Sequence, residues 1–280
     1  MKTILFPTDF SEASENAAHY LMGLAGQVDI TEITLLHSYA TEGPSIIYMS
    51  DFTEPIVIRQ DEVKAESVVR LNDFRTRLAA MTAADIGISE ISLDKSLDMA
   101  IPEIIREQNI DLVVSGIEPY GKTTDQSTGT KAIKIALDLQ VPVLIIPADA
   151  TYQRIETLLL TCDLKNVARS VPKDKLANLL TELEARLIVV NIDFENRHYR
   201  PDTLMEQTGL HRALDATGAE YFFIEHKDIV HGIVEFAEEK KVQMIISIPK
   251  EHGVFDRLFH PGVTKKLASV SPLPIMLIHN

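Results

Sequence analysis

An internal repeat constrains the fold of this chain more than any other feature of its sequence. Residues 4–9 align with residues 158–163 at a shift of 154, and the same shift places residues 35–37 over residues 189–191. Two further segments align at a shift of 132, namely 112–115 with 244–247 and 141–144 with 273–276. Gap-free blocks in the same order indicate a duplicated unit, whose second copy is the shorter in its middle part.

Apolar runs and helical periodicities alternate within each copy. In the first copy this pattern predicts strands at 3–6, 33–37, 88–93, 112–115 and 143–146, and helices at 11–24, 61–81, 101–108 and 130–139. Most of the strand runs lack polar alternation, which is typical of strands buried on both faces of a sheet. The sequence therefore predicts an α/β fold of two tandem, doubly wound parallel-sheet domains, at 1–149 and 153–280.

Composition limits the partners and the location. The net charge of −14 disfavours nucleic acid and anionic membrane surfaces. The one cysteine, Cys162, excludes an intrachain disulfide. No apolar run approaches the length of a membrane helix, and the amino-terminal sequence lacks the pattern of a secretory signal. We therefore expect a cytoplasmic protein without nucleic-acid or membrane partners.

The turn after the first strand carries the first candidate site residues, Thr8 and Asp9. Asp9 or Ser11 can cap the helix that follows by accepting backbone N–H bonds. Because Asp9 stands at the carboxyl end of a strand, where doubly wound sheets bind ligands, it can also face a ligand. Both interpretations stay open on the sequence.

The segment after the fourth strand, residues 115–130, is rich in glycine and hydroxyl side chains. Its glycines let a ligand approach the backbone, Lys122 supplies a positive charge, and Gly129–Thr130 opens a helix whose free N–H groups suit a phosphate. A flexible polar loop with a helix cap is the alternative.

Residues 116–123 also satisfy the G-x-x-x-x-G-K-[ST] pattern of phosphate-loop nucleotidases. Against that class, the predicted helix starts only after Gly129 and not at Lys122.

The whole chain resembles the universal stress protein family in a tandem two-domain form. Many members bind ATP through G-x2-G-x9-G-[ST] after strand four, and Gly116, Gly129 and Thr130 match the outer parts of that pattern. The middle glycine is displaced, because Pro119 holds its place and Gly121 follows two residues later. The resemblance implies a five-stranded, adenine-nucleotide-binding-like fold in each half.

The resemblance also implies the ligand and its neighbours. ATP or AMP would lie in the first domain, with Mg²⁺ as a candidate ion bridging the phosphates and no metal site made by the protein alone. Residues expected to line this nucleotide site are Thr8, Asp9, His37, Ser38, Gly116, Gly121, Lys122, Gly129 and Thr130. We identify no catalytic residue.

The second copy departs from the family pattern. Ile248 stands where the first copy has Gly116, and Pro261 stands where it has Gly129. We therefore predict that this copy does not bind ATP in the manner of the family. Basic residues nevertheless flank the start of a predicted helix here, as a solvated helix end or an anion site: His252, Arg257, His260, Lys265 and Lys266.

Three functions stay open. The first, which the resemblance implies, is a stress-response regulatory protein that binds ATP or AMP and has at most weak ATPase activity. The second is a nucleotide-independent interaction scaffold, and the third is a phosphate-loop nucleotidase or phosphotransferase.

Family resemblance also implies that the last strands of the two domains, 141–146 and 273–278, pair within the chain as a pseudo-dimer. Dimerisation of the whole chain and a protein partner stay open. The apolar segment 41–61 can cover the nucleotide, contact a partner or pack against the second domain.

Overall fold

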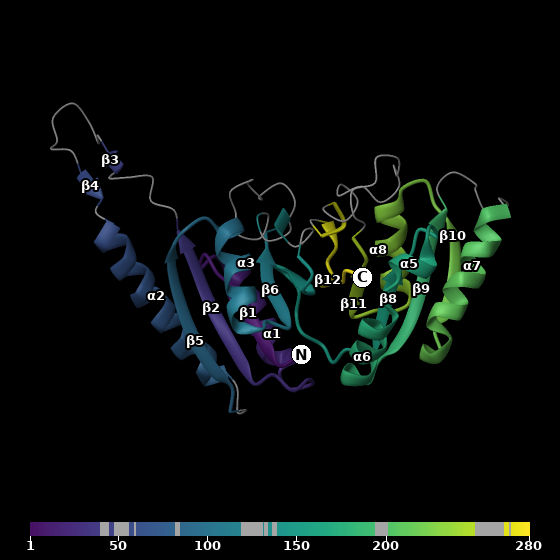
Figure 1. Cartoon of the computed structure of the whole chain (residues 1–280), viewed down its shortest axis with the longest axis horizontal. Coiled ribbons are helices and arrows are strands. Elements are labelled where there is room, and N and C mark those ends of the chain that lie inside the picture. Colours follow the sequence, from purple (N-terminus) through teal and green to yellow (C-terminus); the bar gives the residue numbers. More distant parts are fainter. Residues whose placement is uncertain are drawn as a thin grey trace.

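In the computed structural model the two halves of the chain lie side by side and share one continuous sheet (Figure 1). The structure describes residues 1–39, 45–47, 56–58, 60–81, 85–118, 131, 134–135, 139–193, 201–249, 266–268 and 270–280. Among these residues, no helix is long and apolar enough to span a membrane.

The first half alternates strands and helices as the sequence predicts. Its elements are β1 (Thr3–Pro7), α1 (Glu12–Leu24), β2 (Glu32–Tyr39), β3 (Ser45–Ile47), β4 (Ile56–Ile58), α2 (Gln60–Met81), β5 (Gly87–Asp94), α3 (Leu97–Gln108), β6 (Leu112–Ile117) and β7 (Val143–Pro147). Most bounds differ from the prediction by one or two residues, and the predicted helix 130–139 lies largely outside the described residues. Helix α3 begins a turn earlier, and β6 continues past Ser115 through Gly116 and Ile117, which pair with Ile146 and Pro147 of β7.

The second half repeats this order with changes in its helices. Its elements are β8 (Thr157–Thr161), α5 (Val167–Ser170), α6 (Lys173–Leu183), β9 (Arg186–Asp193), α7 (Pro201–Leu214), the 3-10 helix η1 (Asp215–Thr217), β10 (Glu220–Glu225), α8 (Ile229–Glu239), β11 (Met244–Ser247) and β12 (Ile275–Leu277).

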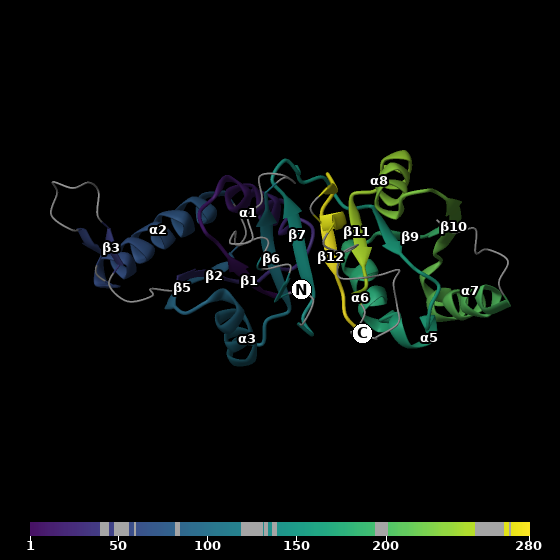
Figure 2. The same ribbon diagram turned by 90° about the horizontal axis from the view of Figure 1, so that it is seen from above.

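The ten strands are ordered β10-β9-β8-β11-β12-β7-β6-β1-β2-β5. Pairing is parallel within each half and antiparallel between β7 and β12, which lie side by side in the middle of the molecule (Figure 2). Leu144 pairs with Met276, its own counterpart at the shift of 132, so the two halves meet with two-fold pseudosymmetry. The predicted intrachain pairing of the last strands is confirmed.

Helices cover both faces of the sheet, as buried parallel strands require. On one face α1, α2, α6 and α7 pack on a core that includes Phe6, Phe74 and Leu160. On the other face α3 and α8 pack on a core that includes Leu5 and Phe236. The prediction of a tandem doubly wound fold is confirmed.

Hydrogen bonds outside the ladders repeat between the halves. The backbone N–H groups of Lys2 and Thr3 donate to the Asp111 carboxylate, at 2.8 and 3.1 Å. At the same positions of the second half, Glu156 and Thr157 donate to the Gln243 amide oxygen, at 3.0 and 2.9 Å. Because 111 and 243 differ by 132 and the other pairs by 154, the structure supports the two shifts found in the sequence.

The Gln27 side chain ties the halves together near the linker. The amide of Gln27 donates to the carbonyl oxygens of Ile155 and Leu183, both at 2.8 Å, and accepts from Ile155 N and the Tyr152 hydroxyl, at 2.9 and 2.7 Å. The Tyr152 ring also lies against Gly23, where an added Cβ would come within 2.4 Å of it.

Strands β3 and β4 form an antiparallel hairpin within the apolar segment 41–61. This hairpin lies beyond α2, at the end of the molecule far from the second half (Figures 1 and 2). The interpretation that the segment packs against the second domain is therefore wrong for these strands. Residues 40–44, 48–55 and 59 lie outside the described part of the chain.

Candidate functional site

Five of the predicted site residues lie at one edge of the first half, on three neighbouring strands. Strand β1 lies between β2 and β6, and all three run parallel, so their carboxyl ends share an edge. This arrangement brings together Thr8 and Asp9 after β1, His37 and Ser38 near the end of β2, and Gly116 near the end of β6.

Local hydrogen bonds fix the turn after β1. The backbone N–H of Thr8 donates to Leu36 O at 2.8 Å, which keeps the chain on β2, and the Thr8 hydroxyl accepts from Phe10 N at 3.0 Å. The Asp9 carboxylate accepts from Ser11 N at 3.0 Å and from the Ser14 hydroxyl at 2.8 Å. The backbone of Phe10 is left-handed, with φ of 61°. Asp9 thus stabilises the start of α1, and Ser11 is the N-cap, as one of the two interpretations predicts.

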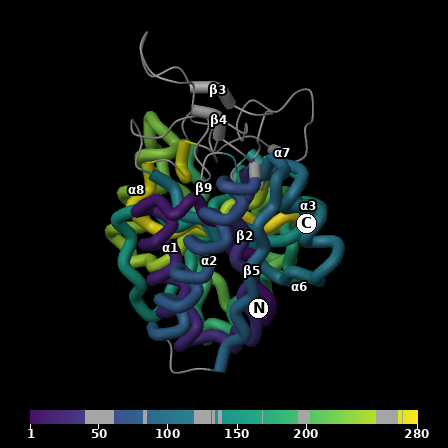
Figure 3. The backbone as a smooth tube through the Cα atoms, turned by 90° about the vertical axis from the view of Figure 1, so that its left-hand side faces the viewer, coloured from purple at the N-terminus to yellow at the C-terminus, as the bar shows by residue number. Residues whose placement is uncertain are grey.

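Phe10 lies between a histidine and an arginine. Its ring centroid is 4.7 Å from that of His37 and 4.3 Å from the guanidinium carbon of Arg70 in α2. Figure 3 looks onto this end of the molecule, where α2 stands beside β2 and β5. Helix α2 therefore supports the turn that carries Asp9, a contribution that no local sequence signal indicated.

His37 is held by a chain of hydroxyl groups. Its Nδ1 is 2.7 Å from the hydroxyl of Ser67 in α2, which is in turn 2.7 Å from the hydroxyl of Ser92 in β5. Burial, and next the positive charge of Arg70, lower the pKa of His37 below its ordinary value, so the ring is neutral at pH 7. His37 thus packs toward α2.

Ser38 points elsewhere, because neighbouring residues of a strand alternate between its faces. Its hydroxyl donates to the carbonyl oxygen of Lys95 at 2.5 Å. Both predicted positions near the end of β2 therefore have partners within the protein.

Gly116 has a packing role that the sequence did not reveal. A Cβ at this position would lie 2.2 Å from the carbonyl oxygen of Ala13 and 3.0 Å from the backbone nitrogen of Ser14. Only glycine lets β6 approach the first turn of α1 this closely. Gly116 is inside β6, whereas the first glycine of a phosphate loop follows its strand.

The remaining predicted positions, apart from Lys266, lie outside the described residues. They are Gly121, Lys122, Gly129 and Thr130 of the first half, and His252, Arg257, His260 and Lys265 of the second-half cluster. Lys266 is described, and its ammonium group is 3.1 Å from the Asp228 carboxylate. A hydrogen bond from His231 N and then the contact with Lys266 lower the pKa of Asp228 to about 2, so Lys266 has an ionised partner.

Among the described residues, no group of three or more His, Cys, Asp or Glu side chains could hold a metal ion.

The second half builds the same turn with different surroundings. Asp163 accepts from Lys165 N at 3.2 Å, as Asp9 accepts from Ser11 N. Here the carboxylate of Glu206 in α7 accepts from Asn166 N and Val167 N, at 3.0 and 2.8 Å, and so caps α5. The aligned turns agree with a duplicated site whose second copy has diverged.

Comparison with known proteins agrees with the architecture. The chain is structurally similar over its full length to a universal stress protein from Archaeoglobus fulgidus, with a TM-score of 0.68, 18% identity, and coverage of 99% of this chain and 98% of that one. A functionally unknown protein and a putative universal stress protein, both from Pseudomonas aeruginosa, follow with TM-scores of 0.58 and 0.57 and identities of 11% and 10%. Both similarities extend over 99% of this chain, and they include 92% and 93% of the two Pseudomonas chains, respectively. No curated protein sequence matches the chain.

Together these observations define a tandem doubly wound α/β protein. The model of the universal stress protein family matches residues 1–147, and the chain therefore belongs to that family.

Proposed function

We propose that the protein is a regulatory protein of the stress response that binds ATP or AMP at the carboxyl edge of its first half, with little or no turnover. The observation that carries this proposal is the place of Asp9. Asp9 follows the end of β1 by two residues, and β1 pairs with β6, the strand that leads into the glycine-rich segment 115–130. A ligand above these two strands would meet an acidic group on one side and the backbone of that segment on the other.

The proposal assigns different parts of the nucleotide to different elements. Thr8 and Asp9 would face the adenosine end, and the ring of His37, through Phe10, would hold their turn in place. Gly121, Lys122, Gly129 and Thr130 would surround the phosphates, as the family pattern implies. Mg²⁺ typically keeps several waters and binds through phosphate oxygens with one or two carboxylates, and the proposal includes it only in that role.

The matched turns of the two halves supply the test. We would titrate ATP with Mg²⁺ into the full chain by calorimetry, and compare Asp9→Asn, its second-half counterpart Asp163→Asn, and Gly129→Pro. Asparagine keeps the oxygen that accepts from Ser11 N or Lys165 N, so both turns should survive. We expect one site per chain, weakened roughly tenfold or more by Asp9→Asn because a charged contact is lost, abolished by Gly129→Pro and unchanged by Asp163→Asn.

Two results would contradict the proposal. If millimolar ATP produces no heat in calorimetry and no thermal shift, nucleotide binding is excluded and the interaction scaffold becomes the function to pursue. ATP hydrolysis abolished by Lys122→Ala would instead favour the phosphate-loop enzyme.

A further inference from the structure

The second half contains a break that the first half lacks. Helix α1 is continuous from Glu12 to Leu24, but its counterpart at the shift of 154 is divided into α5 and α6 by Val171 and Pro172. Proline has no N–H to donate, and it forces the residue before it into an extended conformation. Val171 has that conformation, with φ of −83° and ψ of 115°.

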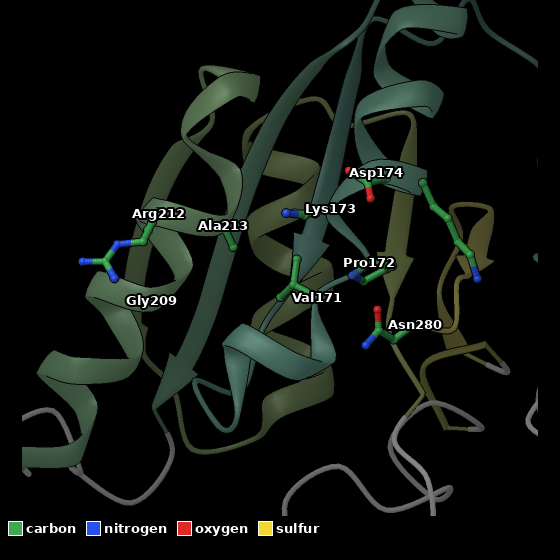
Figure 4. Close-up of a pocket in the computed structure, with 9 residues that line it drawn as sticks. Val171, Pro172, Lys173, Asp174, Gly209, Arg212, Ala213 and Asn280 are labelled. Atoms are coloured by element: carbon green, nitrogen blue, oxygen red, sulfur yellow. The ribbon is translucent and has the colours of Figure 1, made fainter.

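A cavity of about 480 Å³ opens at this break, between α6, α7 and the end of the chain (Figure 4). Val171 and Pro172 are buried and form its apolar part. The counterparts of these residues in the first half, Ala17 and Ala18, are buried inside the unbroken α1. The cavity thus belongs to the divergence of the second half and lies away from the carboxyl edge of the first.

Positive side chains dominate the polar part of the cavity. Lys173, Lys175 and Arg212 line it together with Asp174 and Asn280. This is an unusual balance in a chain with 41 acidic and 27 basic residues. Neither Lys173 nor Arg212 lies within 4.0 Å of a carboxylate in the part of the chain that the structure describes.

The side chains are arranged around the opening. Lys173 extends from the start of α6 toward Ala213 of α7, whereas the Arg212 side chain on α7 points outward, away from the other labelled residues (Figure 4). Lys175 donates to the carbonyl oxygen of His279 at 2.7 Å, which anchors its stem to the segment after β12. The lining thus includes basic residues of both helices, Lys173 and Arg212, with Lys175 fixed beside them.

We propose that this cavity is a second ligand site, for a small molecule that carries a phosphate or carboxylate group. Lysine and arginine bind such oxyanions through charge-assisted hydrogen bonds, and arginine can bind them in a bidentate manner. The apolar surface of Val171 and Pro172 would accept the uncharged part of the molecule, as in ligand pockets of this size. The site is independent of nucleotide binding in the first half.

Inorganic phosphate is the probe, and backbone amide NMR of the full chain is the measurement, at an ionic strength held constant with chloride. We expect saturable shifts at Val171, Gly209 and Ala213 in the low-millimolar range. In the double variant Lys173→Ala, Arg212→Ala the dissociation constant should rise roughly tenfold or more, since two charged contacts are removed. The control Lys64→Ala, Arg106→Ala removes the same charges from the exposed faces of α2 and α3.

Residue-specific shifts separate this proposal from nucleotide binding. Shifts confined to the residues after β1 and β6 would overturn the cavity site while leaving the first-half site intact. Shifts at the cavity that do not saturate, or that the two double variants weaken equally, would also overturn it. Thermal unfolding of each variant checks that the fold is kept, because all four substituted side chains are exposed.

Discussion

Phe10 and Leu164 stand 154 residues apart and have the same left-handed backbone, with φ of 61° and 53°. In each case the residue two positions earlier accepts from its backbone N–H: the Thr8 hydroxyl at 3.0 Å and the Cys162 sulfur at 3.4 Å. The turn after the first strand is therefore kept in a half that has lost the glycine pattern. Its geometry serves the fold of both halves, and a ligand role for Asp9 must be tested against that structural role.

Gly116→Ala should destabilise the protein by about 1 to 3 kcal/mol, because the new Cβ would overlap the Ala13 carbonyl on the rigid first turn of α1. Gly209→Ala is the matched control. Nothing lies within 4 Å of its added Cβ, so it should gain about 0.5 to 1 kcal/mol from the better helix propensity of alanine. Urea unfolding measures both. Equal effects of the two substitutions would contradict the packing role of Gly116.

Gln27→Ala should cost about 2 to 4 kcal/mol, because four hydrogen bonds are lost and the carbonyls of Ile155 and Leu183 lose their amide donor. Gln153→Ala, at an exposed position between β7 and β8, should change the free energy of unfolding by less than about 0.5 kcal/mol. Equilibrium unfolding followed by circular dichroism compares them. If Gln27→Ala lowers the free energy of unfolding of only one half, seen as a separate unfolding transition, then Gln27 does not couple the halves.

Stability should fall at mildly acidic pH through His37. Its pKa is lower in the folded chain than its ordinary value of 6.5, so the unfolded state binds more protons as the pH falls through 6.5 toward the folded pKa. Protonation therefore favours unfolding in that window and has no such effect above it. His37→Gln removes the titration. Its free energy of unfolding, measured between pH 7.5 and 5, should decline less than that of the wild type, and parallel curves would contradict this.

The sequence was sufficient for the architecture because the repeat and the apolar strands carry long-range information. The shift of 132 aligns Leu144 with Met276, and these two residues pair in the sheet. The end of β6 was missed because glycine is a poor strand former, and its place in the ladder beside Ile146 is a tertiary effect.

The support of the candidate site was harder to predict. Ser67 and Arg70 contact His37 and Phe10 from a helix that begins about 20 residues beyond β2, and no local pattern marks them. The break in the second half did leave a signal, since Pro172 falls in the middle of the segment aligned with α1. A proline in the interior of a helical segment predicts such a break.

Glu184→Gly should stabilise the protein by about 0.5 to 1 kcal/mol. Glu184 is the C-cap of α6 and has a left-handed backbone, with φ of 53° and ψ of 37°, a conformation that costs a residue with a Cβ more than it costs glycine. The substitution also removes its ion pair with Arg154 at 2.8 Å, but both side chains are exposed, and such pairs contribute little. Ala177→Gly, in the right-handed interior of the same helix, should instead lose about 1 kcal/mol. Urea unfolding measures both changes in free energy, and a gain for Glu184→Gly with a loss for Ala177→Gly would follow from the backbone conformation at each position. A loss for both variants would mean that the Arg154 contact outweighs the strain at the cap.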